Sequence, residues 1–231
     1  MRDRKQPWAD NWMIAEPLGQ GGQGTTKIVR SLKETGKRGV LKILNKNRSQ
    51  KARGRMRREV VSLDVLAKEG VKVPHVYESN LDLFDDPSVT LYFVMELIPG
   101  KQLTKVIEEN SRLSLDKAAA YTIDLAATVA AAHKQDVLHR DLKPDNIIVR
   151  DFDKSDLVIV DYGLSYNEED EEGPDLTNTS EGMRNRLRAL PELNALGGDR
   201  KDKRSDITAL AAILYYCLTG HGPGQLRDGK G

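Results

Sequence analysis

The hydrophobic pattern of this chain changes character near Gly100. From Trp12 to about Leu97, short runs of β-branched and aromatic residues alternate with glycine, asparagine and aspartate turns, a pattern typical of strands. Beyond Gly100 the apolar runs are longer and have helical spacing. The sequence therefore predicts an α+β protein with a small sheet-rich lobe in residues 1–98 and a larger, mainly helical lobe in residues 99–231.

Three segments are expected to form helices. Residues 50–68 have one apolar side and charges elsewhere, so they predict a single helix within the first lobe. Residues 114–134 are rich in alanine, the best helix former, and begin with Ser114, a good N-cap. A third helix is predicted at about 205–218, ended by Gly220.

Charge and cysteine content exclude several classes of protein. The 36 lysines and arginines nearly balance 35 acidic residues, so we expect no general attraction to nucleic acid or to an anionic membrane. Cys217 is the single cysteine, in an apolar helical run, which suits a reducing cytosol. The longest apolar runs fall short of the roughly 20 residues of a membrane span. A cytoplasmic location is the resulting expectation.

Residues 19–24 form a G-x-G-x-x-G loop with Gly19, Gly21, Gly22 and Gly24. The segment after it is rich in β-branched residues, which predicts a strand, whereas a dinucleotide-binding loop would open a helix. Glycines between two strands let backbone amides approach phosphates closely. The simpler alternative is a plain glycine-rich turn.

Lys42 alternates with apolar residues in a predicted strand. A lone strand lysine usually faces solvent, so its interest depends on a partner. Glu59 lies beside the apolar face of the following helix and is the candidate. Held by Glu59, Lys42 could bind phosphates of a nucleotide.

The segment His139-Arg140-Asp141-Leu142-Lys143-Pro144-Asp145-Asn146 follows the alanine-rich helix and precedes an apolar run. It resembles the catalytic loop of eukaryotic-type serine/threonine protein kinases, H-R-D-L-x-x-x-N. The resemblance implies a bilobal kinase-like fold with a small antiparallel sheet, one main helix beside it, and an incomplete helical lobe. It also implies that Asp141 accepts the proton of a substrate hydroxyl, with Lys143 near the transferred phosphoryl group.

Two residues are expected to hold a metal ion. Asp161-Tyr162-Gly163 follows an apolar strand and is similar to the D-F-G motif of the family, with tyrosine in place of phenylalanine. By this resemblance Asn146 and Asp161 are the expected ligands of Mg²⁺, with Mn²⁺ as the alternative ion.

The resemblance extends to the adenine pocket. Val40 stands where the family usually has alanine, and Thr26 where it usually has valine. The expected nucleotide-binding residues are the four loop glycines, Val40, Lys42, Met95, Glu96, Ile98 and Ile148.

Further residues resemble regulatory parts of the family. Leu63, His139 and Tyr162 would belong to a hydrophobic stack, and Asp206 to the aspartate that braces the catalytic loop. Arg140 resembles an arginine that grips a phosphorylated loop. The candidate phosphate acceptors are Thr177, Thr179 and Ser180.

Two charged runs complete the pattern. Residues 168–172 are all acidic, and seven basic residues crowd the start of the first helix: Lys46, Arg48, Lys51, Arg53, Arg55, Arg57 and Arg58. Solvated surface is the simple expectation for both runs. The sharper hypothesis is that they attract each other and partly replace a phosphate.

The end of the sequence departs from the family pattern. Ala189-Leu190-Pro191-Glu192 is an imperfect A-P-E motif, and the chain ends soon after Gly220. A missing C-terminal segment or a regulatory partner is expected to complete the large lobe.

The predicted function is transfer of the γ-phosphoryl group of ATP to serine or threonine hydroxyls of proteins. Two alternatives stay open at this stage: a pseudokinase or inactive fragment acting as a binding module, and a small-molecule phosphotransferase.

Overall fold

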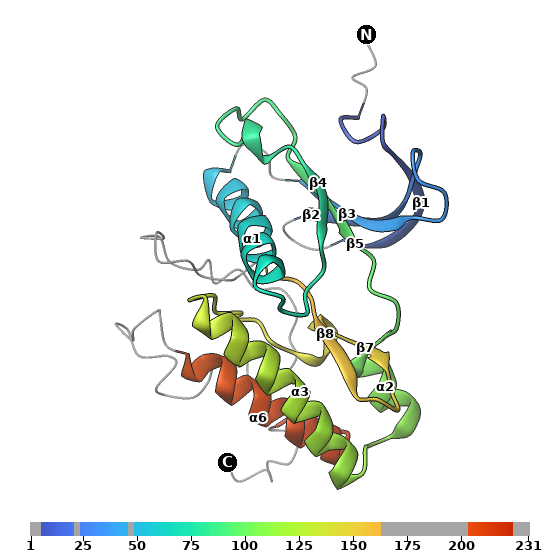
Figure 1. The fold of residues 1–231 in the computed structure, drawn as a ribbon, viewed down its shortest axis with the longest axis vertical. Coiled ribbons are helices and arrows are strands. Elements are labelled where there is room, and N and C mark those ends of the chain that lie inside the picture. Colours follow the sequence, from blue (N-terminus) through green and yellow to red (C-terminus); the bar gives the residue numbers. More distant parts are fainter. Residues whose placement is uncertain (1–5, 21–23, 46–48, 163–202, 224–231) are drawn as a thin grey trace, which may run out of the picture. The chain divides into compact units, whose positions relative to one another are not determined.

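The computed structural model describes residues 6–20, 24–45, 49–162 and 203–223 (Figure 1). The chain forms two compact units, one of Met1–Asp64 and Pro74–Leu97, the other of Val65–Val73 and Ile98–Gly231. In chain order the elements are β1 (Trp12–Gln20), β2 (Gly24–Ser31), β3 (Arg38–Leu44), α1 (Gln50–Lys68), β4 (Val76–Ser79), η1 (Leu81–Leu83), β5 (Tyr92–Glu96), β6 (Lys101–Gln102), α2 (Leu103–Asn110), α3 (Leu115–Lys134), η2 (Pro144–Asn146), β7 (Ile147–Asp151), β8 (Asp156–Ile159) and α6 (Arg204–Thr219).

The first unit is an antiparallel sheet with one long helix. Its strands lie in the order β1-β2-β3-β5-β4, each antiparallel to its neighbours. Alternation along β3 turns Leu41 to one face and Lys42 to the other. The Leu41 face is covered by a buried cluster of Trp8, Trp12, Val29, Leu41, Tyr92 and Val94. On the other side, Lys42 meets α1, which carries Glu59.

A turn before β1 is fixed to the sheet through the carboxylate of Glu78. Its Oε2 accepts hydrogen bonds from Asn11 Nδ2 at 2.8 Å and Trp12 Nε1 at 2.9 Å. Its Oε1 accepts one from the Tyr92 hydroxyl at 2.6 Å. The Trp12 ring also stacks on Tyr77, with ring centroids 5.9 Å apart. This turn is therefore part of the core of the first unit.

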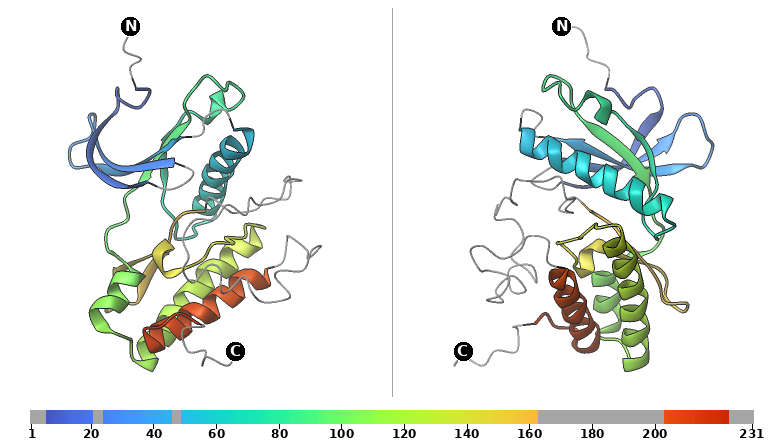
Figure 2. Two further views of the ribbon diagram at one scale, coloured as in Figure 1. Left: turned by 180° about the vertical axis from the view of Figure 1, so that it is seen from behind. Right: turned by 60° about the vertical axis from the view of Figure 1, so that its left-hand side comes forward.

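Among its described residues, the second unit combines a small sheet with the helices α2, α3 and α6. β6, β7 and β8 form an antiparallel sheet in that order. The helices α3 and α6 lie side by side in both Figures 1 and 2. Within this unit α3 also packs on β8. The α+β composition with an antiparallel small sheet agrees with the predicted fold class.

The three predicted helices are confirmed, with limits correct to within one residue. The Ser114 side chain caps α3 by accepting a hydrogen bond from the Lys117 N–H. Gly220 ends α6 with a φ of +73°, a left-handed conformation that favours glycine. The sequence patterns did not indicate α2, because its buried residues Leu103, Val106 and Ile107 give only two turns of periodicity.

Cys217 is buried in α6, as expected, and burial raises the pKa of its thiol to about 12. Across the described ranges, no helix combines the length and apolar character needed to cross a bilayer.

Several predictions fall on residues outside the described ranges. They concern Gly21, Gly22, Lys46, Arg48, the acidic run, the phosphate acceptors Thr177, Thr179 and Ser180, and the A-P-E-like segment. The lobe limits 1–98 and 99–231 stay a prediction.

Trp12→Ala should destabilise the first unit by about 3–5 kcal/mol, because it opens a cavity and removes the hydrogen bond to Glu78. Trp8 and Trp12 are the two tryptophans of the chain, so fluorescence of Trp8 reports unfolding of this unit in the variant. Urea titration gives the free energy of unfolding. Leu32→Ala, at a 55% exposed position, is the control and should change it by less than about 0.5 kcal/mol. Equal effects of the two substitutions would contradict the packing described.

Candidate active site

In the first unit, the structure brings Lys42 of β3 and Glu59 of α1 together. The Lys42 Nζ and the Glu59 Oε1 form an ion pair, and Glu59 is only 5% exposed. A buried carboxylate beside an ammonium group forms a strong, charge-assisted hydrogen bond that fixes both side chains. Lys42 is therefore held in place on the sheet by a helix.

The glycine loop adjoins Lys42 through strand pairing. Gly19 of β1 pairs with Thr26 of β2, and Thr26 pairs with Lys42 of β3. A Cβ at Gly24 would lie 2.6 Å from the Ile43 carbonyl oxygen, so a larger residue would push β2 away from β3. At Gly24, glycine is required for this close approach.

The predicted adenine-binding residues fall in both units. Val40 and Met95 are cross-strand neighbours of β3 and β5 and are buried. The Glu96 N–H already donates to the His75 carbonyl at 2.8 Å, so that group is engaged within the sheet. Ile98 and Ile148 are half-buried residues of the second unit.

In the second unit, Asp141, Lys143 and Asn146 come together at the start of β7. Asn146 Nδ2 donates to the Asp141 carbonyl at 2.9 Å. Lys143 Nζ lies 3.4 Å from Asp141 Oδ2. The side-chain nitrogen of Asn146 is thus engaged with Asp141, which leaves its amide oxygen as the atom that could accept a further bond or contact a metal ion.

Asp161 lies at the same end of the β7–β8 hairpin as Asn146. Ile147 pairs with Ile159, and the Val160 N–H donates to the Asn146 carbonyl at 2.9 Å. Asp161 has a φ of +66°, a left-handed conformation in which aspartate is more frequent than most residues. Amide and carboxylate oxygens are the donors that Mg²⁺ prefers, so the residue types at this end fit such an ion.

The loop before Asp141 is built around the carboxylate of Asp206. Asp206 is 1% exposed and accepts the backbone N–H groups of His139 at 2.9 Å and Arg140 at 2.8 Å. His133 Nε2 lies 2.8 Å from the same carboxylate. Burial raises the pKa of Asp206, but the hydrogen bonds, led by that of His133, outweigh it and leave the pKa below its ordinary value. Asp206 is therefore an ionised internal support.

His139 connects the catalytic loop to Asp161-Tyr162. Its Nδ1 accepts the Asp141 N–H at 3.3 Å, so the ring proton sits on Nε2 and is donated to the Val160 carbonyl at 3.2 Å. The His139 and Tyr162 ring centroids lie 4.7 Å apart. Burial raises the pKa of the Tyr162 hydroxyl. Leu63, the third predicted member of the stack, is buried in the first unit.

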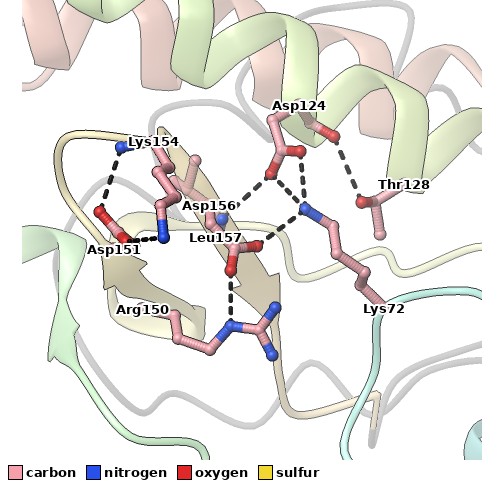
Figure 3. Close-up of polar contacts among 8 residues, drawn as sticks. All are labelled: Lys72, Asp124, Thr128, Arg150, Asp151, Lys154, Asp156 and Leu157. Carbon is pink, nitrogen blue, oxygen red and sulfur yellow. Dashed lines mark hydrogen bonds and ion pairs between the residues drawn. The ribbon is translucent and has the colours of Figure 1, made fainter.

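The far end of the hairpin is held by an ion-pair network (Figure 3). Lys72 Nζ donates to both carboxylate oxygens of Asp124, at 2.6 and 2.8 Å, and to Asp156 at 3.1 Å. Asp124 also accepts the Leu157 N–H at 3.1 Å. Asp156 accepts from Arg150 Nε at 2.6 Å, and this bond is the main reason why the pKa of Asp156 is lowered. Sequence reasoning missed the network, because its members are far apart in the chain.

The solvated-surface expectation for the basic run is wrong at two positions. Arg53 is fully buried and Arg55 is 7% exposed. Burial of an arginine is tolerated where its N–H groups are satisfied, and carbonyl oxygens supply such partners to Arg53. The acidic run lies outside the described residues, so its attraction to the basic run stays a hypothesis.

Comparison with known proteins gives a consistent result. Residues 12–231 match a family model described as the protein kinase domain. The chain is 34% identical over 217 residues to the serine/threonine-protein kinase PknD of Mycobacterium tuberculosis, covering 92% of this chain and 30% of that protein. It is 30% identical over 226 residues to a calcium/calmodulin-dependent protein kinase type I of Schizosaccharomyces pombe, covering 96% of this chain and 63% of that protein. The chain thus spans less than two thirds of the length of these relatives.

Asp206→Asn should destabilise the protein by about 3 kcal/mol at pH 7, because an amide cannot accept both loop N–H groups as an ionised carboxylate does. Because folding lowers the Asp206 pKa, its contribution is present above the ordinary value of 3.8 and is lost as pH falls through the lowered one. Urea unfolding followed by circular dichroism should therefore show the stabilities of wild type and variant converging as the pH falls below 3.8. The exposed Asp116→Asn serves as control, and a pH-independent difference would contradict this account.

Lys72→Met should lower the free energy of unfolding by about 1 kcal/mol, a modest value because the Lys72 side chain is 37% exposed. The loss should shrink in 1 M NaCl, where the charges are screened. Lys101→Met, which breaks a more exposed pair with Glu109, is the matched control and should have a smaller effect. A loss for Lys72→Met that is unchanged by salt would argue against an ionic role.

Proposed function

The chain belongs to the protein kinase family, and we propose that it is a serine/threonine protein kinase that transfers the γ-phosphoryl group of ATP to protein hydroxyls. The observation that carries the proposal is the double arrangement above: Lys42 held by Glu59 in one unit, and Asp141 grouped with Lys143 and Asn146 in the other. The relatives named as serine/threonine-protein kinases support the choice of hydroxyl substrate.

Each side chain has a distinct task in the proposed reaction. Lys42 binds phosphate oxygens, and Glu59 keeps its ammonium group in place. Asp141 accepts the proton of the attacking hydroxyl, and Lys143 balances negative charge near the transferred group. Catalysis then rests mainly on positioning and charge, with little covalent chemistry from the protein.

ATP and a divalent metal ion are the general requirements of the family. We infer that Asn146 and Asp161 hold Mg²⁺, with Mn²⁺ as the alternative, since both offer oxygen atoms at one end of the hairpin. A bound ion neutralises the negative charge of the phosphates. The nucleotide-binding roles predicted for the loop glycines, Val40, Met95 and Glu96, and those predicted for Ile98 and Ile148, belong to the same proposal.

The pseudokinase alternative is not favoured. A binding module has no need for a lysine held by a buried glutamate or for an aspartate bonded to an asparagine, whereas phosphoryl transfer uses both. The Lys143-Pro144 pair, which resembles the serine/threonine form of the catalytic loop, favours a protein substrate over a small molecule. A cytoplasmic location belongs to the same proposal.

Asp141→Asn should lower kcat by roughly 10²- to 10⁴-fold, because the general base is lost while the shape is kept. Transfer from radiolabelled ATP to generic protein substrates measures kcat, and a fluorescent ATP analogue measures nucleotide affinity, which should change little. Asp116→Asn, an exposed α3 substitution, should be fully active. If wild type bound Mg-ATP but phosphorylated nothing beyond the Asp141→Asn level, the binding-module alternative would replace this proposal.

A further inference from the structure

Arg53, in the first turn of α1, is 0% exposed. All three nitrogen atoms of its guanidinium group donate hydrogen bonds to the loop between β4 and β5. Nε donates to the Phe84 carbonyl at 2.7 Å, Nη1 to Val89 at 2.9 Å and Nη2 to Leu83 at 2.8 Å. The planar guanidinium suits such a set of fixed acceptors, which an ammonium group cannot match. The start of α1 is thus bonded to one loop through three directed contacts.

The loop holds its carbonyls in place with bonds of its own. Asn80 Oδ1 accepts the Tyr92 N–H at 2.8 Å, and Asn80 Nδ2 donates to the Thr90 carbonyl at 3.0 Å. Asp86 accepts from the Ser88 N–H at 2.8 Å and its hydroxyl at 2.6 Å. These hydrogen bonds within the loop fix its conformation, so that its carbonyl groups are already positioned to accept hydrogen bonds from Arg53.

The loop is also continuous with the strand that pairs with Lys42. It runs into β5, where Phe93 is the cross-strand partner of Lys42. On the other side of the contact, Arg53 precedes Glu59 by six residues of the same helix, about 9 Å of rise. Figures 1 and 2 show this loop and the start of α1 at the same end of the first unit.

We propose that Arg53 is a positioning residue for the Lys42–Glu59 pair. Its hydrogen bonds to carbonyl groups within residues 83–89 fix α1 along the sheet, so that Glu59 reaches Lys42. The contacts are then continuous. β3 pairs with β5, β5 is continuous with the loop, and the loop binds Arg53 of α1. Glu59 of α1 in turn binds Lys42 of β3. The expected effect on catalysis rests on the proposed kinase function, whereas the expected effect on hydrogen exchange in α1 does not.

Arg57 provides a matched control. It lies one turn further along α1, is exposed, and places its guanidinium 5.2 Å from the Phe84 ring centroid. An exposed cation–π contact of this kind contributes less than hydrogen bonds that satisfy a buried charge. Arg53→Met and Arg57→Met therefore remove the same charge from the same helix, but only the first releases the loop.

The kinetic test is a double-mutant cycle with Glu59→Gln. Arg53→Met should lower kcat/KM by about 10- to 100-fold, as expected for a small displacement of a catalytic group, and Arg53→Lys should restore part of it. In the Glu59→Gln background, Arg53→Met should cost less than about threefold, because its effect passes through Glu59. Arg57→Met should stay within about twofold of wild type. Full additivity of the Arg53 and Glu59 effects would overturn the proposal.

Hydrogen exchange measured by mass spectrometry tests the mechanical part without activity. Arg53→Met should speed exchange at least about tenfold in peptides covering residues 50–62, and Arg57→Met should not. If Arg53→Met fails to fold, Arg53→Lys replaces it in both arms, with smaller changes in the same direction. Unchanged exchange in α1 would refute the positioning role. If the wild type were inactive but showed the expected exchange pattern, the kinase function would be refuted, and the role of Arg53 in fixing α1 to the loop would be supported.

Discussion

The loop that leads to Asp141 depends on hydrogen bonds from its backbone to the buried carboxylate of Asp206. An ionised group inside a protein costs several kcal/mol unless donors surround it, and Asp206 obtains them from His133 and from two successive backbone N–H groups. Those N–H groups belong to the peptide units just before Asp141, and Arg140 adopts a φ of +63° among them. The cost of this left-handed residue is offset by the bonds to Asp206, so the direction of Asp141 is set from α6.

Charged side chains act as connectors at three further places. Glu59 fixes Lys42, Arg53 fixes a loop, and Lys72 joins Asp124 of α3 to Asp156 of β8. In each case the bonds join separate elements of the fold. Directed bonds of this kind restrict the positions of the side chains that they hold, which the proposed phosphoryl transfer would need. The β7–β8 hairpin is thus supported at one end by Asn146 and at the other by the Lys72 network.

Sequence reasoning succeeded where the signal is local. The three long helices follow from residue spacing, Ser114 and Gly220 mark helix ends through their own chemistry, and the catalytic-loop motif is contiguous. Reasoning failed where the signal depends on tertiary contact. Nothing in the basic run distinguishes Arg53, whose partners lie 30 to 36 residues away, from the exposed Arg57. The Lys72 network likewise joins residues 52 and 84 positions apart. Loop carbonyls carry no sequence signal, so an arginine that binds them cannot be recognised beforehand.

Tertiary contacts also bring together the residues of the candidate site. In the first unit, Glu59 lies against Lys42 because residues 50–64 of α1 and all of β3 belong to one compact unit. In the second, Asp141, Lys143 and Asn146 owe their grouping to α6 and to the β7–β8 hairpin. Each set is therefore organised by contacts inside its own unit. Groups held by such contacts would need little reorganisation in the proposed phosphoryl transfer, which is the condition under which fixed charges stabilise a transition state most effectively.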